Sequence, residues 1–346
     1  MTNRRPPRCD IALLVDEETG DYARDGRFRV ARHSVEAHVL ACLRARRGRV
    51  EVVPFDPVVA PTIARLRALD PRLVFNLTEW VDGDRNLDAA IAGLLDMLQL
   101  PYTGTGADGM RLARDKALSK TVVEALGIAV PRHFVPARGG RVRNPGVPYP
   151  LIVKPQLDDG SVGISRNSLV RSERELRERL RRIRLASGGP LMCEEFIPGR
   201  DLFVAVIGNA PRVLPAVELV IRRKGPAAPE FMTYRVKHDR GYSARWRVGY
   251  RVPRLAPGLV STIDAASRAI FHALRLRDYA RIDYRLTPDG RLYFLEANPN
   301  PDLSPHAFGR NRCFAGMEYA ALIRTIVAAA RRRCGLRARP STRCDP

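Results

Sequence analysis

The chain has 346 residues, of which 45% are hydrophobic, and a formal net charge of +22 at pH 7. A chain of this length can hold about two or three domains with a sizeable core, and no apolar run reaches the roughly 18 residues that a membrane-spanning helix needs. The charge comes mostly from arginines spread over the whole chain, which indicates a compositional bias and disfavours a specific nucleic-acid interface.

The cysteines and the N-terminus indicate the compartment. The six cysteines are scattered without paired spacing, so we expect neither a disulfide framework nor a zinc site. The first residues, MTNRRPPRCD, carry charge but no apolar stretch follows them, which disfavours a secretory signal. We therefore expect a reduced, cytoplasmic environment.

The first hundred or so residues alternate apolar strands with amphipathic helices. The strands are predicted over 11–15, 50–55 and 73–77, the helices over 35–43 and 88–98, and a polar stretch over 16–29. This alternation is typical of a small α/β domain with a parallel sheet.

The middle of the chain carries a predicted helix over 116–126, a Gly- and Pro-rich loop over 136–150 and an apolar strand that ends at Lys154. An ammonium without a partner would be costly there, and a polyphosphate ligand would relieve that cost. The alternative is a lysine that reaches from the strand end to solvent. Residues 160–163 (GSVG) form either a simple turn or a loop whose N–H groups cap phosphate oxygens.

An arginine-rich segment follows over 177–184. Leu176, Leu180 and Ile183 have helical spacing around it, so we expect an amphipathic helix with a solvated basic face. Near the end of the chain we expect a helix over 317–330 and a disordered tail over 331–339. The polar, irregular segment 222–246 is the candidate for a lid.

Residues 278–305 are the most informative segment. A Pro-Asp-Gly turn at 288–290 between two alternating runs predicts a β-hairpin. Arg281 and Asp283 share one face of the first strand, and Glu296 and Asn298 share one face of the second. Two carboxylates and an amide oxygen suit Mg²⁺. The alternative is a hairpin with solvated charges.

Six motifs, taken in chain order, resemble the ATP-grasp ligases and in particular their D-alanine–D-alanine ligase branch, over roughly residues 70 to 330. They are 100–106 (LPYTGTG), Asp115-Lys116 with Lys120 and 126–131 (LGIAVP), 151–155 (LIVKP), 160–165 (GSVGIS), 194–199 (EEFIPG), and Arg281-x-Asp283 with Glu296-Ala-Asn298. Each motif alone is weak, and their order makes the resemblance specific.

The resemblance implies a fold and a domain order. It implies an α/β (α+β ATP-grasp) fold in which two ATP-grasp subdomains clasp the nucleotide, and a homodimer formed through the N-terminal domain. The expected divisions are an N-terminal α/β domain over 1–104, a central subdomain over 105–197, a C-terminal subdomain with the metal site over 198–332 and a basic disordered tail over 333–346.

The same resemblance implies an ATP-dependent carboxylate–amine ligase that joins two amino acids, or a peptide and an amino acid, through an acyl phosphate. Two Mg²⁺ ions, with Mn²⁺ as a substitute, would bind Asp283, Glu296 and Asn298. Arg281 would stabilise the tetrahedral oxyanion, and Lys237 and Ser161 are the other expected catalytic residues. The nucleotide would be bound by Lys116, Lys154, Gly160, Ser161, Gly163, Glu194, Glu195, Phe196, Ile197 and Asp201.

The departures from the family pattern lie mostly at the amino-acid sites. Residues 76–84 (NLTEWVDGD) replace a Gly-rich segment, Asp201 replaces a Glu, Asp302 a Gly, Ala307 a Ser and His238 a Tyr, and the N-terminal Glu of the family has only Glu17, Glu18 or Glu36 as candidates. We therefore expect small-molecule substrates other than two D-alanines.

Several interpretations stay open at this stage. The chain could be a D-alanine–D-alanine ligase proper, a nucleotide-binding pseudo-ligase without turnover, or a basic nucleic-acid-binding protein. His238 and His306 are candidate general bases, since imidazole titrates near neutral pH.

Overall fold

The computed structural model describes residues 9–45, 48–137, 142–187, 189–223, 225, 228–304 and 317–336. The chain divides into two compact units, which are described separately. The first comprises Met1–Gly104, Gly208–Ala210 and Met317–Pro346, and the second comprises Thr105–Ile207 and Pro211–Gly316. The predicted division into three domains and a tail stays a prediction beside these two units.

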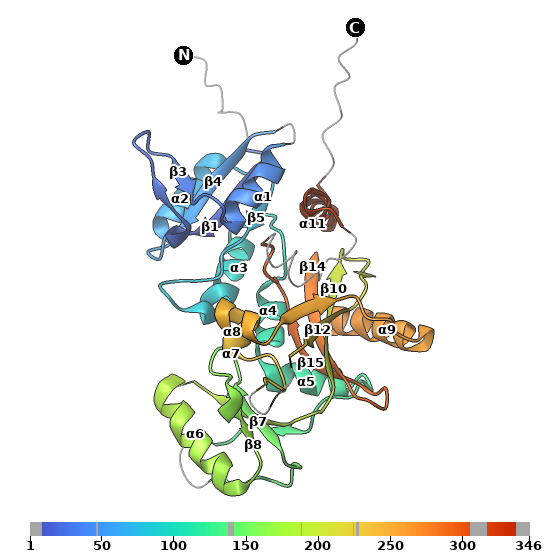
Figure 1. The fold of residues 1–346 in the computed structure, drawn as a ribbon. Coiled ribbons are helices and arrows are strands. Elements are labelled where there is room, and N and C mark those ends of the chain that lie inside the picture. The colour runs from blue at the N-terminus through green and yellow to red at the C-terminus, as the bar shows by residue number, and fades with distance from the viewer. Residues whose placement is uncertain are drawn as a thin grey trace, which may run out of the picture. The chain divides into compact units, whose positions relative to one another are not determined.

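The first unit is built on a parallel three-stranded sheet in the order β4-β1-β5 (Figure 1). Its strands are β1 (Ile11–Asp16), β4 (Val50–Phe55) and β5 (Val74–Asn76), and its α-helices are α1 (Val35–Arg44), α2 (Ala60–Leu69), α3 (Asp88–Met97) and α11 (Tyr319–Arg333). Residues 11–15 are all buried, which is typical of a central strand of a parallel sheet. The strands and helices predicted for residues 11–98 are confirmed.

Several elements of this unit go beyond the prediction. The stretch 16–29 holds a short 3-10 helix, η1 (Glu17–Thr19), and a hairpin of β2 (Gly20–Tyr22) with β3 (Phe28–Val30). Its strands carry few apolar residues, so no alternation marks them. α2 was not predicted, because its buried face consists only of Thr62, Leu66 and Leu69.

Helix α11 packs with the first unit and ends later than predicted. Arg331–Arg333 form its last turn, where cations interact favourably with the helix dipole. The Arg333 guanidinium donates a hydrogen bond to the Tyr102 carbonyl oxygen at 2.7 Å. The prediction of a disordered tail is therefore wrong for residues 331–333, and residues 337–346 lie outside the described part of the chain.

The second unit contains an antiparallel four-stranded sheet in the order β6-β9-β7-β8. Its strands are β6 (His133–Phe134), β7 (Leu151–Pro155), β8 (Leu169–Val170) and β9 (Leu191–Glu195), accompanied by α4 (Ala107–Arg114), α5 (Lys116–Glu124), the 3-10 helix η3 (Arg166–Ser168) and α6 (Glu173–Ser187). Leu176, Leu180 and Ile183 of α6 pack into the core beneath this sheet, which confirms the amphipathic helix. The helix predicted over 116–126 is also confirmed.

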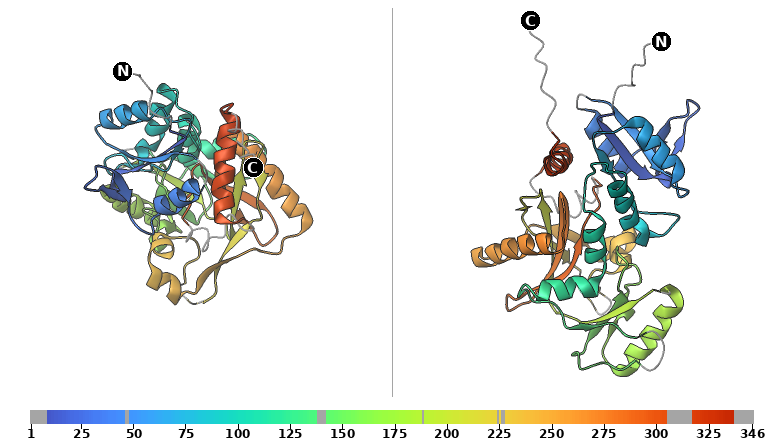
Figure 2. Two further views of the ribbon diagram at one scale, coloured as in Figure 1. Left: turned by 90° about the horizontal axis from the view of Figure 1, so that it is seen from above. Right: turned by 180° about the vertical axis from the view of Figure 1, so that it is seen from behind.

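A six-stranded antiparallel sheet completes this unit, in the order β13-β12-β10-β14-β15 with β11 beside β10. Its strands are β10 (Arg200–Ile207), β11 (Arg212–Val213), β12 (Val217–Ile221), β13 (Val248–Arg251), β14 (Tyr279–Leu286) and β15 (Leu292–Asn298). Helix α9 (Pro257–Ala273) lies against one face of this sheet (Figure 2), where Ile270 and Phe271 meet Leu202 and Ile282 in the core. The other face is free to carry polar side chains.

The segment 222–246 differs from the prediction of an irregular lid. It contains two short helices, α7 (Tyr234–His238) and α8 (Arg240–Arg245), each capped by a side chain: Thr233 caps α7 and Asp239 caps α8. Local capping residues of this type are a sequence signal for helix starts.

Among the described helices of the chain, none is long and apolar enough to cross a membrane.

The backbone at Gly199, just before β10, packs too closely against β14 to leave room for a side chain. Its φ is +154°, and a Cβ there would lie 2.2 Å from the Leu286 carbonyl oxygen, a backbone atom that cannot move aside. We expect Gly199→Ala to lower the free energy of unfolding in urea by roughly 2–4 kcal/mol. Gly290→Ala is the matched control, because Gly290 has φ +87° but a Cβ added there would meet no atom within 4 Å. Equal losses in both variants would contradict the steric explanation.

Candidate active site

A cavity of about 690 Å³ lies in the second unit and is lined by residues of both of its sheets. This volume is in the usual range of small-molecule sites. Along β10, Asp201 and Phe203 line the cavity while Leu202 and Val204 belong to the core, as the strand's alternation requires. The predicted site residues that line it are Lys154, Gly160, Ser161, Glu194, Glu195, Phe196, Ile197, Asp201, Lys237, Arg281, Asp283, Glu296 and Asn298.

The predicted hairpin is formed by β14 and β15. Arg281 pairs with Asn298 in the register and Asp283 pairs with Glu296, and a β-bulge follows Asp283. The Arg281 guanidinium meets both carboxylate oxygens of Asp283, at 2.7 and 2.8 Å, and the Asn298 side-chain amide lies 3.4 Å from the same carboxylate. The hairpin therefore brings the four polar side chains together, as expected from their spacing.

The two carboxylates of this cluster have different electrostatic surroundings. Burial raises the pKa of Asp283, and the Arg281 charge opposes that shift only in part. Burial alone would also raise the pKa of Glu296, but the charges of Lys116, Lys154 and Arg281 outweigh it and hold that pKa below its usual range. Asp283 therefore resists ionisation in this structure, whereas the nearby cations favour the charged form of Glu296.

The donor set fits a hard divalent cation. Asp283, Glu296 and Asn298 offer only oxygen ligands, which Mg²⁺ prefers over nitrogen and sulfur. Over the described ranges of the chain, no cluster of three or more His, Cys, Asp or Glu side chains forms a metal site. The available set is therefore two carboxylates and one amide, which leaves the remaining coordination positions to water and substrate.

Lys154 is not an isolated ammonium, contrary to the expectation from its strand. It forms an ion pair with Glu194 (Nζ to Oε1, 2.5 Å), and Lys120 lies 3.3 Å from the other carboxylate oxygen. Burial would raise the pKa of Glu194, but the two lysines outweigh it and lower that pKa to about 2. No sequence pattern signals this pairing, because the three side chains come from α5, β7 and β9.

Both carboxylate oxygens of Glu194 face an ammonium group. The Oε2 atom is buried and lies 3.3 Å from Lys120 Nζ, without a well-aligned hydrogen bond. The charge of Lys120 offsets part of the cost of burying that acceptor. Glu194 also lines the cavity, so a change at this carboxylate can reach a bound ligand.

The glycine-rich loop lies beside Lys154 and has left-handed backbone conformations. Gly160, Ser161 and Gly163 have φ values of 69°, 64° and 70°. At Gly163 a Cβ would lie 2.9 Å from Pro155 Cγ, so the loop can run against β7 only with glycine there. Gly163 does not line the cavity, and its carbonyl instead accepts a hydrogen bond from Arg179 at 2.6 Å.

The hinge after β9 has an apolar and a polar side. The Phe196 ring lies 5.9 Å from the Phe231 ring and under the Arg285 guanidinium, at 5.3 Å. Arg285 also forms a hydrogen-bonded ion pair with Asp201 and donates to the Ile197 carbonyl oxygen at 2.8 Å. Asp201 therefore meets an arginine in this structure, and its contact with a ribose stays a prediction.

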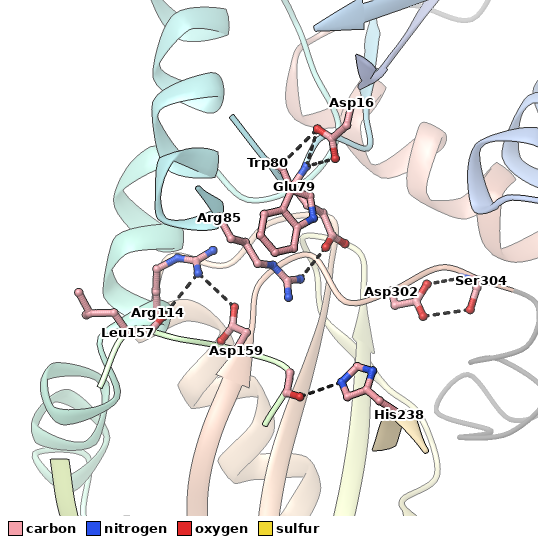
Figure 3. Close-up of polar contacts among 11 residues, drawn as sticks. Asp16, Glu79, Trp80, Arg85, Arg114, Leu157, Asp159, His238, Asp302 and Ser304 are labelled. Atoms are coloured by element: carbon pink, nitrogen blue, oxygen red, sulfur yellow. Dashed lines mark hydrogen bonds and ion pairs between the residues drawn. The ribbon is translucent and has the colours of Figure 1, made fainter. Parts of the chain in front are cut away.

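Lys116 lies outside the cavity lining. Its ammonium donates to the Asp158 carbonyl oxygen and lies 4.0 Å from the Asp159 carboxylate. Arg114 pairs with the same carboxylate at 3.4 Å and reaches the Leu157 carbonyl oxygen at 3.5 Å (Figure 3). These contacts join the α4–α5 junction to the chain just before the glycine-rich loop, and a phosphate contact of Lys116 stays a prediction.

Helix α7 contacts the glycine-rich loop directly. The His238 ring nitrogen Nε2 lies 3.1 Å from the Gly160 carbonyl oxygen (Figure 3), and the Tyr234 N–H donates to the Ile164 carbonyl oxygen at 3.0 Å. Lys237, on the same helix, is exposed and lines the cavity. His238 as a general base stays a prediction, and the second candidate, His306, lies outside the described residues.

Asp302 and Ala307 are two of the residues predicted to depart from the family pattern. Asp302 lines the cavity and accepts hydrogen bonds from the backbone N–H and the hydroxyl of Ser304, at 2.7 and 2.9 Å (Figure 3). A carboxylate therefore stands where the family has a glycine. Ala307 lies outside the described residues.

In the first unit, Asp16 contacts the segment 76–84, which was predicted to depart from the family pattern. It ends β1 and accepts hydrogen bonds from the N–H groups of Glu79 (3.1 Å) and Trp80 (3.3 Å), while Arg85 pairs with the Glu79 carboxylate at 2.6 Å (Figure 3). Ligands of α/β sheets bind at such carboxyl ends of strands. Sequence reasoning missed Asp16, although its place after an apolar strand was a usable signal.

Of the three candidates for the N-terminal glutamate, Glu17 and Glu18 are exposed, and Glu36 is half-buried in the first turn of α1. The N–H groups of residues 79 and 80 donate to Asp16, which is the residue just before Glu17. The predicted roles of the three glutamates stay predictions.

Asp16 gives a pH-dependent prediction. Burial raises its pKa from 3.8 to about 6, so the folded chain binds more protons than the unfolded chain between these values and loses stability as the pH rises through them. We expect Asp16→Asn to remove this loss, which amounts to about 1–3 kcal/mol. Thermal unfolding of both proteins from pH 4 to pH 7 measures it, and parallel curves would contradict the assignment.

Comparison with known proteins places the chain in a family. Residues 122–328 match the family model described as the D-ala D-ala ligase C-terminus. The chain is 34% identical over 254 residues to a D-alanine–D-alanine ligase of Desulfotalea psychrophila, covering 69% of this chain and 73% of that protein. It is 31% identical over 290 residues to a protein of Sinorhizobium fredii that carries the name uncharacterized protein y4sG, covering 80% and 82%.

Solved structures show the same fold. The D-alanine–D-alanine ligase from Bacillus anthracis complexed with ATP superposes with a TM-score of 0.67 at 19% identity, covering 96% of this chain and 100% of that one. The enzyme from Coxiella burnetii gives a TM-score of 0.66 at 18% identity, covering 95% and 96%. The predicted ATP-grasp fold is confirmed.

Proposed function

This chain belongs to the D-alanine–D-alanine ligase family, whose members are ATP-dependent ligases that form C–N bonds, and from that premise we propose that it joins the carboxylate of one amino acid to the amine of a second amino acid or peptide. The observation that carries the proposal is the cluster of Arg281, Asp283, Glu296 and Asn298 on the wall of the cavity that Lys154 and Glu194 also line.

The nucleotide would bind between the hinge after β9 (residues 194–197) and the glycine-rich loop (residues 160–163). The Phe196 ring and Ile197 would contact adenine, and backbone groups and one carboxylate of residues 194–197 would form hydrogen bonds with it. Lys154, Lys237 and the N–H groups of the glycine-rich loop would hold the phosphates. Asp283, Glu296 and Asn298 would bind Mg²⁺, which neutralises phosphate charge when it is bound.

The reaction proceeds in two displacements. An oxygen of the first substrate's carboxylate attacks the γ-phosphorus of ATP, the bond to the bridging oxygen breaks, and ADP leaves. The amine nitrogen of the second substrate then attacks the acyl carbon and loses its proton. Arg281, held by both oxygens of Asp283, stabilises the tetrahedral oxyanion until the bond to phosphate breaks.

The substrates proposed here are not two D-alanines. Asp302 supplies a carboxylate in the cavity, and residues 76–84, fixed by Asp16, lack the Gly-rich pattern of the family. The second candidate, D-alanine–D-alanine ligase proper, is favoured by the names of the relatives. Those names do not favour the pseudo-ligase. A homodimer, a cytoplasmic location and the absence of a nucleic-acid partner are further proposals.

The test is ADP release from Mg²⁺-ATP across D- and L-amino acids with hydroxylamine present. Hydroxylamine traps an acyl phosphate as a hydroxamate, so the carboxylate substrate is found without its amine partner. We expect one class of acids to give both ADP and hydroxamate. D-alanine as the best donor would favour the second candidate, and ATP binding without ADP release for any acid would contradict ligase activity.

A further inference from the structure

Lys120 is a buried lysine next to the candidate nucleotide site. Its side chain is 0% exposed, and it does not line the cavity. It contacts Glu194, which lines the cavity together with Lys154. Lys120 can therefore affect a bound nucleotide only indirectly, through the cavity-lining residues that it contacts.

The three side chains form a chain of alternating charge. Glu194 Oε1 forms an ion pair with Lys154 Nζ at 2.5 Å, and Glu194 Oε2 lies 3.3 Å from Lys120 Nζ. Two ammonium groups and one carboxylate leave one positive charge in excess. Without Lys120, Lys154 and Glu194 would form a neutral pair, and these two residues together would offer a polyphosphate no net positive charge.

The position of Lys120 is fixed by its own contacts. Its ammonium donates to the Leu295 carbonyl oxygen and lies 5.5 Å from the centre of the Phe294 ring. Burial lowers its pKa to about 8, with the Glu194 charge acting against that shift. The charged groups that face it are Glu194 and Glu296, which favour its protonated form, and Lys154, which opposes it.

We propose that Lys120 is a positioning residue for the nucleotide phosphates: it offsets the charge of Glu194, so that the Lys154 ammonium presents an excess positive charge to the cavity. The proposal rests on the proposed nucleotide site, but it does not depend on which amino acids are ligated.

The first test compares ATP with adenosine, which lacks the phosphates. We expect Lys120→Met to weaken ATP binding to the full-length chain by roughly ten- to a hundredfold and adenosine binding by less than about threefold. Titration calorimetry without amino acids measures both. Lys120→Arg keeps the charge and should keep the ratio of the two affinities.

Val123→Ala is the matched control for a loss of packing. Val123 is 0% exposed on the same helix, so its truncation lowers stability without changing a charge. Its ratio of ATP to adenosine affinity should equal that of the unsubstituted chain. A similar fall of this ratio in Val123→Ala would show that the helix, and not the Lys120 charge, is responsible.

The double variant Lys120→Met/Glu194→Gln tests the charge balance itself. Of Lys120, Lys154 and Glu194, only Lys154 then carries a charge. The ratio of ATP affinity to adenosine affinity should therefore be higher than in Lys120→Met. The double variant should also fold where Lys120→Met does not, because it removes the buried Glu194 carboxylate oxygen that Lys120→Met leaves without its ammonium partner.

Three results overturn the proposal alone: an unchanged ratio in Lys120→Met, a similar fall of the ratio in Val123→Ala, or a double variant with no recovery. Failure of the unsubstituted chain to bind ATP would overturn the nucleotide site as well.

Discussion

Asp283→Asn and Glu296→Gln each abolish ADP release, with an expected loss of at least about a thousandfold in kcat. Each substitution removes one of the two buried negative charges that the hairpin brings together, while it keeps the side-chain shape. The loss should appear in the hydroxylamine assay, because the missing charge is needed before the acyl phosphate forms.

Asp289→Asn is the control for this prediction. Asp289 lies in the exposed turn of the same hairpin, away from the cavity lining, so its neutralisation should leave turnover unchanged. Turnover of Asp283→Asn or Glu296→Gln within about tenfold of the unsubstituted enzyme would contradict a role in metal-assisted phosphoryl transfer.

Arg281→Lys is expected to separate the two steps of the reaction. Lysine keeps the positive charge but loses the planar fork that holds both oxygens of Asp283. We expect hydroxamate formation to fall by less than about tenfold and C–N ligation by roughly a hundredfold or more, because the oxyanion forms only in the second step.

The comparison needs both rates on the same protein, measured as hydroxamate and as ligated product. Arg291→Lys is the control, since Arg291 is an exposed residue just before β15 whose guanidinium lies 5.5 Å from the Tyr293 ring. Equal losses in the two rates of Arg281→Lys would mean that Arg281 acts through Asp283 alone.

The hairpin was predictable because its signals are local. The Pro-Asp-Gly turn and the alternation of residues fix which side chains share a face, so Arg281, Asp283, Glu296 and Asn298 could be grouped from the sequence alone. The same holds for α6, whose buried leucines recur with helical spacing.

Contacts between distant segments could not be predicted. Lys120 bonds to Leu295, 175 residues away, and Arg285 pairs with Asp201, 84 residues away. Periodicity fixes the face that a residue occupies, but it does not say which charge meets that face. This is why the pairing of Lys154 with Glu194 and of Asp201 with Arg285 was not predicted, while a ligand contact of Lys154 or Asp201 stays a prediction.

Weak local patterns explain the elements that were missed. α2 buries only three residues, and β2 and β3 are three residues each, so neither gives a run long enough to recognise. The short helices α7 and α8 depend on the side-chain caps Thr233 and Asp239 in a stretch dominated by charges.

Activation of a carboxylate by transfer of the γ-phosphate of ATP is the step on which the proposed function depends. The most direct test uses the donor found by hydroxamate trapping, labelled with ¹⁸O in its carboxylate, and follows the phosphate product by ³¹P NMR. We expect one ¹⁸O to pass from the donor to each phosphate released. Unlabelled phosphate would show that water attacks ATP directly, and it would contradict the acyl-phosphate mechanism.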